Sequence, residues 1–386
     1  MQYRQFGDWR ISVIGYGCYG LSGAYGPVDE GKFSKTIRTA HEHGVNFFDT
    51  AEGYGGAERF LGKAVAPFRD EVTIATKLSG ESGSPDLSAR AVRDACEASL
   101  ARLNIETIDL YQIHFDDPHT PILETLSALD DLVQEGKIKK YGVCHLPLDR
   151  VREYAELGNT FSVLMELSPV ARTTLSTLLP ICIEHDMAAL AFSVTGRGIL
   201  SGRYQPGHEF DEGDIRRIDP LFKRERFASA IRVRDQLAGI GKSYGASAVQ
   251  MAIAWVLAQP RVACALTGTS SIKHLKENIR AGEIELQDKD LASLDQFLND
   301  EDIRLTAAQR ETIQELLNKP LDKDPQKAFE DLLYVLETAI IIGSVREADV
   351  VPAFKELFAL RGNFDEDAQQ KMKGIQILLR DLISAH

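Results

Sequence analysis

Short apolar runs alternate with longer amphipathic stretches along the first three quarters of the chain. The stretches have helical spacing, as in residues 33–44, which Gly44 closes, and residues 88–104, which Ser88 is expected to cap. Eight runs alternating with helices is the count of a closed (β/α)8 barrel, the TIM barrel, rather than an open doubly wound sheet. The predicted strands span residues 11–18, 45–49, 72–77, 108–114, 140–144, 162–167, 187–193 and 262–268.

The barrel pattern ends after Leu298. We therefore expect residues 1–300 to form the barrel and residues 301–386 to form a C-terminal all-α helical extension. The four helices predicted in the extension begin at Thr306, which forms a capping box with Gln309, at Pro325, near Pro352 and near Asp365.

Two apolar stretches of this extension, AIIIG and VVPAFKELFAL, need a cover. We expect the extension to form an interface with another copy of the chain or with a protein partner. Covering the barrel mouth is the alternative.

Composition narrows the class of protein. The chain has 386 residues, 44% of them hydrophobic, and a net charge of −13, which argues against a nucleic-acid partner. Its five cysteines are scattered and contain no CxxC pair, so neither a disulfide framework nor a metal site is expected. The N-terminal residues lack a signal-peptide pattern, and no segment has the apolar length of a membrane span, so we expect a cytoplasmic protein without a membrane partner.

Candidate chemistry lies at the ends of three successive predicted strands. Asp49 ends the second strand, Lys77 the third and His114 the fourth, while Tyr54 follows in the loop after Asp49. The C-terminal strand ends of a barrel open onto one mouth, where catalytic residues gather. We therefore expect the four side chains to converge there.

These four groups suit proton delivery to an oxygen that gains negative charge. Tyrosine is a proton donor with an ordinary pKa near 10, which the Lys77 ammonium is expected to lower. Asp49 would hold Lys77 charged, and His114 would orient a carbonyl. Since no strand end offers a serine or cysteine nucleophile beside a base, a nicotinamide hydride would complete the reaction.

Several separated motifs resemble the aldo-keto reductase superfamily: GVNFFDTAEGYGGAERFLG, VTIATK, IDLYQIH and LTGTSSIKHLKEN. The likeness extends from about Tyr3 to Asn299. It implies an enzyme that reduces an aldehyde or ketone, its small-molecule substrate, with NAD(P)H. The family's tetrad of Asp, Tyr, Lys and His falls on Asp49, Tyr54, Lys77 and His114, with the tyrosine as general acid.

The resemblance also implies where the dinucleotide binds. Phe192 would stack on the nicotinamide, and the loop after it would wrap the pyrophosphate. His274 stands where many NADPH-specific members have arginine, but Lys273 beside it supplies charge, so NADP(H) is favoured and NAD(H) stays open. The implied cofactor positions are Cys144, His145, Leu164, Phe192, Ser193, Thr195, Arg197, Gly198, Arg203, Gly268, Thr269, Ser270, His274, Glu277 and Asn278.

The chain departs from the family where the nicotinamide carboxamide is held. Members commonly present a Ser-Asn pair after strand five and a glutamine on strand six, but Cys144, His145 and Leu164 occupy these positions. Leucine offers no hydrogen bond, whereas histidine can donate and accept. This departure motivates an alternative function: a nicotinamide-nucleotide-binding sensor or scaffold with little turnover, acting through a partner bound by the C-terminal helices.

Overall fold

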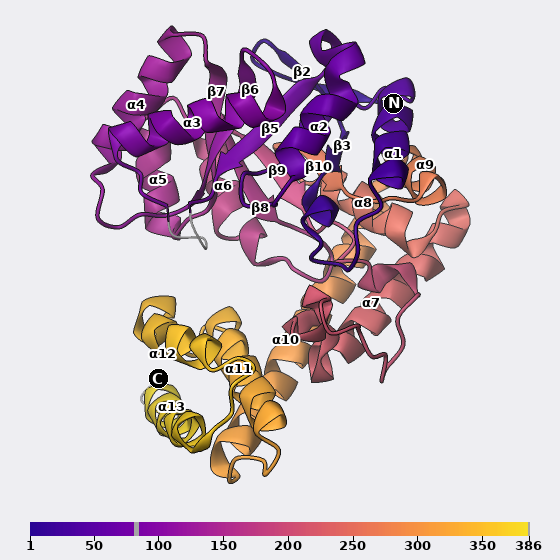
Figure 1. Cartoon of the computed structure of the whole chain (residues 1–386). Coiled ribbons are helices and arrows are strands. Elements are labelled where there is room, and N and C mark those ends of the chain that lie inside the picture. Colours follow the sequence, from indigo (N-terminus) through magenta and orange to yellow (C-terminus); the bar gives the residue numbers. More distant parts are fainter. Residues whose placement is uncertain (81–84, 385–386) are drawn as a thin grey trace. The chain divides into compact units, whose positions relative to one another are not determined.

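The computed structural model of the protein describes residues 1–80 and 85–384 (Figure 1). These residues group into two compact units. The first comprises Met1–Ile215 and Val233–Leu294, and the second comprises Arg216–Arg232 and the residues from Asp295 onward. Arg216–Arg232, which we expected to be part of the barrel, therefore belongs with the C-terminal helices.

The first unit is built on a closed parallel barrel, and the predicted fold is confirmed. Within the described residues, eight strands pair in chain order, and the last pairs with the first to close the ring. Long apolar runs suit such strands because helices cover the outer face and side chains fill the interior. The strands are β3 (Ile14–Gly17), β4 (Phe47–Asp49), β5 (Thr73–Leu78), β6 (Ile108–Phe115), β7 (Ile138–His145), β8 (Ser162–Glu166), β9 (Ala188–Phe192) and β10 (Val262–Thr267).

An antiparallel hairpin precedes the barrel and divides the first predicted strand. Residues 11–18 are split between β2 (Trp9–Ser12), which pairs with β1 (Tyr3–Phe6), and the first barrel strand β3. Phe6 and Ile11 of the hairpin belong to the same buried cluster as Leu110 and Leu190 of the barrel strands. The hairpin thus adds to the barrel core.

Helices alternate with the barrel strands, and α1 to α6 surround them in Figure 1. Ser88 is the N-cap residue of α3, as predicted, and Gly44 follows α1 with a left-handed φ of 86°. The helices are α1 (Glu30–Glu42), α2 (Ala57–Val65), α3 (Ala89–Leu103), α4 (Ile122–Gln134), α5 (Leu148–Leu157), α6 (Leu178–Glu184), α7 (Arg224–Gly241), α8 (Ala248–Ala258) and α9 (Ile272–Ala281). Short 3-10 helices lie between them at Tyr19–Ser22, Ala66–Glu71, Thr173–Leu175, Ile199–Ser201, Ile215–Arg217, Pro220–Phe222 and Lys242–Tyr244.

The C-terminal helices are α10 (Asp288–Asn318), α11 (Pro325–Ile341), α12 (Glu347–Ala359) and α13 (Glu366–Ser384). Two predicted helix starts are wrong. Thr306 and Gln309 lie inside the unbroken α10 rather than at a cap, and Pro352 lies inside α12. The start at Pro325 and the last start are confirmed, since Asp365 accepts a hydrogen bond from the Ala368 backbone N–H at the beginning of α13.

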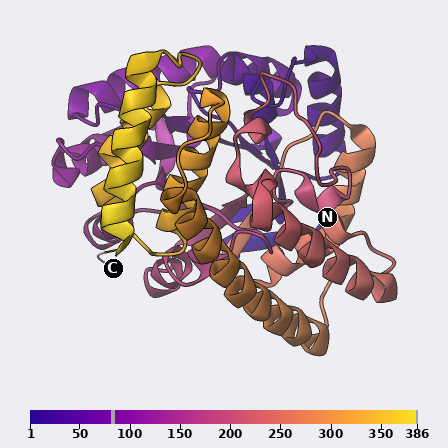
Figure 2. The same ribbon diagram turned by 90° about the horizontal axis from the view of Figure 1, so that it is seen from below.

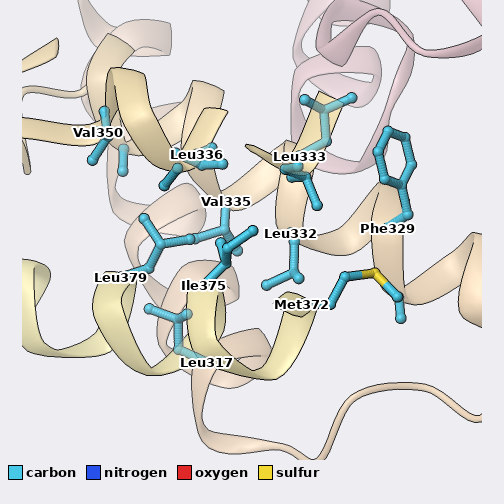
Figure 3. Packing of buried hydrophobic residues seen from close by; sticks show 14 of the residues in the cluster. Leu317, Phe329, Leu332, Leu333, Val335, Leu336, Val350, Met372, Ile375 and Leu379 are labelled. Carbon is cyan, nitrogen blue, oxygen red and sulfur yellow. The ribbon is translucent and has the colours of Figure 1, made fainter. Parts of the chain in front are cut away.

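The second unit has an apolar core of its own. Leu317 of α10, Phe329 and Leu336 of α11, and Met372 and Leu379 of α13 are almost completely buried against one another (Figure 3). Helices α11 and α13 contact each other and run side by side in Figure 2. The apolar stripes of these helices therefore find their cover mainly within the unit.

Specific contacts attach Arg216–Arg232 to this unit. Ile218 packs against its core, and Glu225 accepts a hydrogen bond of 2.6 Å from the Tyr334 hydroxyl. Arg232 forms an ion pair with Glu301, a carboxylate that is almost fully buried. No helix in the part of the chain that the structure describes is long and apolar enough to cross a membrane.

Candidate active site

A buried ion pair lies at the C-terminal ends of β4 and β5. The Lys77 ammonium donates to Asp49 Oδ1 at 2.7 Å and to the Thr50 carbonyl oxygen at 2.6 Å. The Lys77 side chain is completely buried and that of Asp49 is 6% exposed. Taking two charges out of water is costly, so each depends on the other to remain charged here.

Tyr54 and His114 lie against this pair. The Lys77 Nζ is 4.9 Å from the centroid of the Tyr54 ring, and the Tyr54 and His114 rings meet edge to face at a centroid distance of 5.8 Å. The structure therefore brings together the four side chains that the strand-end pattern singled out. They come from β4, β5, β6 and the loop that follows β4.

The protonation of Tyr54 differs from the sequence expectation. Burial raises the pKa of the phenol, and the charge of Lys77 and its hydrogen bond to the phenol offset only part of this rise. Lys77 lowers the Tyr54 pKa as expected, but burial, which the sequence did not indicate, outweighs this effect and the net direction is upward. The phenol stays protonated at neutral pH, the form that a proton donor requires.

The lysine of this ion pair keeps its proton. Burial by itself lowers the pKa of Lys77, but Asp49, Tyr54 and Cys144 together outweigh it and the net direction is upward. Burial raises the pKa of Asp49, and Lys77 opposes that rise. The lysine is thus held as an ammonium beside Tyr54.

His114 is neutral and hydrogen-bonded. Burial, with the nearby charges of Lys77 and His145, lowers its pKa to about 2. The His114 Nδ1 lies 2.6 Å from the Ser79 hydroxyl oxygen, which also accepts the Gly53 backbone N–H at 3.3 Å. When Ser79 donates its proton to Nδ1, the Nε2 of His114 carries the ring proton and can donate to a ligand oxygen.

Sequence reasoning missed Ser79, although a signal was available. Side chains two residues apart on an extended segment point the same way, so Ser79 follows Lys77 toward the barrel mouth. Its backbone is held in place by Glu52, whose Oε1 accepts from the N–H groups of Ser79 at 2.6 Å and Gly80 at 2.7 Å. The loops after β4 and β5 are thereby tied together.

Aromatic rings extend from the tetrad along the strand ends. The Tyr19 ring lies 5.1 Å from that of Tyr54, and Phe115 stacks on His114 at 4.3 Å. Further along, His145 meets Phe192 edge to face at 5.3 Å. Such surfaces suit flat, partly apolar ligands.

The residues at the implied carboxamide positions differ in exposure. Cys144 and Leu164 are buried in the barrel core, with exposures of 1% and 4%. The His145 side chain is exposed, yet surrounding protein still removes hydration and lowers its pKa to about 4, with the charges of Lys77 and Arg197 adding to this. His145 is therefore the polar group of the three that reaches solvent.

The loop after β9 has an unusual backbone. Ser193, Arg197 and Gly198 have positive φ values of 54°, 52° and 90°, and the Thr195 carbonyl accepts the Gly198 N–H. Left-handed residues within a loop create concave backbone surfaces that bind anions, so this segment fits a pyrophosphate. Arg203 is exposed, whereas Arg197 forms an ion pair with Glu166 at 3.0 Å.

The segment after β10 packs closely on β3. A side chain at Gly268 would come within 2.6 Å of the Gly17 carbonyl oxygen, so only glycine fits. The Thr269 carbonyl accepts a hydrogen bond of 2.7 Å from the Tyr16 hydroxyl. This contact fixes the chain as it enters α9.

The remaining implied positions surround the start of α9. Ser270 and His274 are exposed, which leaves them open to a ligand at the helix N-terminus. Asn278 is buried, and Glu277 is partly buried, with its carbonyl accepting from the Gln250 side chain at 3.1 Å. The exposed pair fits the adenosine end of a dinucleotide more directly than Glu277 and Asn278 do.

One cluster at the mouth was not foreseen. His114, Cys144 and His145 have ligand atoms that all lie within 4.8 Å of one another. The sequence indicated no metal site because its cysteines are scattered and unpaired. The barrel assembles the cluster from the ends of two neighbouring strands, β6 and β7.

Comparisons with known proteins agree with this geometry. A model of the Aldo/keto reductase family matches residues 13–299. Aldo-keto reductase str7 of Strobilurus tenacellus is 33% identical over 316 residues, which cover 78% of this chain and 93% of the relative.

Two solved structures extend the comparison. The glycerol dehydrogenase AKR11B4 from Gluconobacter oxydans matches with a TM-score of 0.71 and 28% identity, over 78% of this chain and 95% of that one. An aldo-keto reductase from Klebsiella pneumoniae in complex with NADPH matches with a TM-score of 0.60 and 26% identity, over 77% and 96%.

The chain therefore belongs to the aldo/keto reductase family, and the resemblance and the enzyme class inferred from the sequence are confirmed. Members are NAD(P)H-dependent oxidoreductases, and the residues that match the family form the barrel. The family match ends at residue 299, so α11, α12 and α13 lie outside it.

Proposed function

We propose that the protein reduces an aldehyde or ketone to an alcohol with NADP(H), and that Tyr54 donates the proton. The observation that carries this proposal is the position of the Lys77 ammonium over the Tyr54 ring, with Lys77 itself held at 2.7 Å by Asp49. A protonated phenol beside a fixed ammonium can release its proton to an oxygen that becomes negative, because the ammonium stabilises the tyrosinate that is left behind.

His114 complements this donor. Because its imidazole is neutral, its Nε2–H can hydrogen-bond a carbonyl oxygen without protonating it, while Ser79 holds the ring through Nδ1. A carbonyl between Tyr54 and His114 would receive two donors. Both donors become more favourable as the oxygen gains negative charge, which is the condition for accelerating the chemical step.

NADPH, when bound, supplies the hydride that attacks the carbonyl carbon. The loop Ser193–Gly198 offers a concave backbone for the pyrophosphate, and Ser270 and His274 offer polar groups at the start of α9. The Klebsiella pneumoniae relative in complex with NADPH supports the preference for NADP(H). His145 is the group available to orient the carboxamide, since Leu164 and Cys144 lie in the core.

The sensor or scaffold hypothesis rests on the departure from the family at Cys144, His145 and Leu164. Its distinguishing expectation is tight NADPH binding with negligible turnover of any simple carbonyl. The steady-state assay below tests both functions, and we favour the reductase because the proton-donating group is complete.

Substitution of Tyr54 by phenylalanine is the direct test. Tyr54→Phe should lower kcat for the best substrate of an aldehyde and ketone panel by about 10²- to 10⁴-fold, the usual contribution of a positioned acid. The Kd for NADPH, measured by fluorescence titration, should be nearly unchanged. Tyr3→Phe is the matched control, because that hydroxyl bonds the Gly44 carbonyl outside the site. Full activity of Tyr54→Phe would show that another group supplies the proton.

A further inference from the structure

The three groups of the cluster lie on adjacent strands at the barrel mouth. Phe115 of β6 is paired with His145 of β7, and His114 and Cys144 each lie one residue before this pair. The ligand atoms of His114, Cys144 and His145 lie within 4.8 Å of one another. Two imidazoles and a thiol at this spacing form a donor set typical of zinc and other thiophilic cations.

The spacing is compatible with metal coordination after a small movement. Bonds of about 2.0 Å to nitrogen and about 2.3 Å to sulfur place tetrahedral ligand atoms roughly 3.3 to 3.6 Å apart. The cluster must therefore contract by no more than about 1.5 Å. His145 can supply that movement, because its side chain is exposed and it is the last residue of β7.

The surroundings of the cluster also suit a metal. Ligating histidines typically donate their second ring N–H to a neighbouring oxygen, and the Ser79 oxygen lies 2.6 Å from His114 Nδ1. With Nδ1 engaged by Ser79, Nε2 is the nitrogen of His114 that offers its lone pair to a metal. The nearby Lys77 ammonium, whose charge acts on both imidazoles, is paired with Asp49 at 2.7 Å, so an approaching cation meets an ion pair rather than a lone ammonium.

We propose that His114, Cys144 and His145 bind a thiophilic divalent cation such as Zn²⁺, with the fourth position open to water. Binding forms one metal–sulfur and two metal–nitrogen bonds and releases the Cys144 thiol proton to solvent, without oxidation or reduction. The metal occupies the His114 lone pair at Nε2, the atom that must carry a proton to donate to a carbonyl. Zn²⁺ therefore inhibits the reductase, a consequence that rests on the proposed function.

Cobalt substitution tests the site without requiring activity. Titration of the nucleotide-free full chain with Co²⁺ should produce a near-ultraviolet thiolate-to-cobalt charge-transfer band that Zn²⁺ displaces. Cys144→Ser should abolish the band. Cys182→Ser, a change at another buried cysteine outside the cluster, should retain it. Ser79→Ala should weaken metal binding by about 10- to 100-fold, as expected for loss of a group that orients a ligand.

Each outcome decides a different point. A Co²⁺ spectrum without the charge-transfer band in the unmodified chain, or an identical band in Cys144→Ser, overturns the site. Should Cys144→Ser fail to fold, His145→Asn at an exposed position replaces it, and unchanged metal affinity in that variant likewise overturns the site. A cobalt band with no Zn²⁺ inhibition retains the site and refutes the competition. Absence of any turnover would count against the proposed function, while the cobalt spectrum still decides metal binding.

Discussion

The Asp49–Lys77 pair allows a quantitative test of what holds the site together. Asp49→Asn keeps the size of the side chain but removes its charge. The Lys77 ammonium, completely buried, then keeps the Thr50 carbonyl at 2.6 Å, a neutral amide oxygen and the neutral Tyr54 phenol as partners, none of them charged. Burial is no longer opposed by a carboxylate, so the pKa of Lys77 should fall from its raised position.

The size of the effect follows from this burial. Removing one member of a buried ion pair typically costs about 3 to 5 kcal/mol of unfolding free energy, because a charge is left without compensation. Asparagine can still accept a hydrogen bond, so we expect about 3 kcal/mol, the lower end of that range. Asp49→Asn combined with Lys77→Met removes both charges and should cost at least about 1 kcal/mol less than Asp49→Asn alone.

Urea unfolding at pH 7, followed by tryptophan fluorescence, measures this change. Both tryptophans, Trp9 and Trp255, lie in the barrel unit, so the signal reports that unit rather than the C-terminal helices. The same samples are assayed for carbonyl reduction. Asp49→Asn should lower kcat as well, because Lys77 is less firmly held as an ammonium beside Tyr54.

Two results would contradict the mutual dependence of Asp49 and Lys77. A cost of less than about 1 kcal/mol, the value of an exposed ion pair, would mean that the Lys77 charge does not depend on Asp49. A double variant whose cost equals the sum of the two single costs would mean that the two groups are not coupled.

Two further stability predictions concern other parts of the barrel. Asp117 accepts hydrogen bonds from the Thr120 hydroxyl and from the backbone N–H groups of Leu87 and His119. Burial by itself raises the pKa of Asp117, but these hydrogen bonds outweigh burial and hold the pKa below its ordinary value. The Asp117 carboxylate therefore stabilises the fold above about pH 4, and this contribution is lost as the pH falls through the folded-state pKa. In Asp117→Asn the Tm should depend less on pH in the acid range. Identical Tm profiles for the variant and the unmodified chain would contradict this. At Gly62 a methyl group would lie 2.0 Å from the Leu103 carbonyl oxygen, so Gly62→Ala should lower the free energy of unfolding in urea by about 1 to 3 kcal/mol or more. Gly239→Ala is the control, because the space around Gly239 is open and the substitution should cost no stability. Equal effects of the two substitutions would show that α2 and α3 separate freely.

Much of the architecture was accessible from the sequence. Strand and helix periods are local properties, so seven of the eight barrel strands could be predicted with boundaries close to those observed, while the first predicted strand merged β3 with the end of the hairpin strand β2. The gathering of Asp49, Lys77 and His114 followed from topology, because parallel strands in a barrel end at a common face. The motifs that pointed to the family are local as well, and the family model matches most of the same range.

Local sequence patterns gave wrong predictions where contacts from several segments of the chain determine the structure. Thr306 has the sequence of a helix cap, but the residues before it continue the helix, and local chemistry alone did not indicate this. Likewise Arg216–Arg232 contains no sign of its attachment to α10 and α11. Its partners are far away in the sequence, since Glu301 lies 69 residues from Arg232 and Tyr334 lies 109 residues from Glu225.

The barrel, the family and the identity of the polar strand ends could thus be predicted from the chain alone, because each depends on short-range periodicity or on fixed motif spacing. The protonation of Tyr54, the hydrogen bond between Ser79 and His114, and the meeting of Cys144 with two imidazoles became visible only in the folded chain. Hydration and ligand distances depend on every segment packed around a group, and no local pattern contains them. Burial of Tyr54 outweighed its neighbour Lys77, and that balance exists only once the barrel has closed.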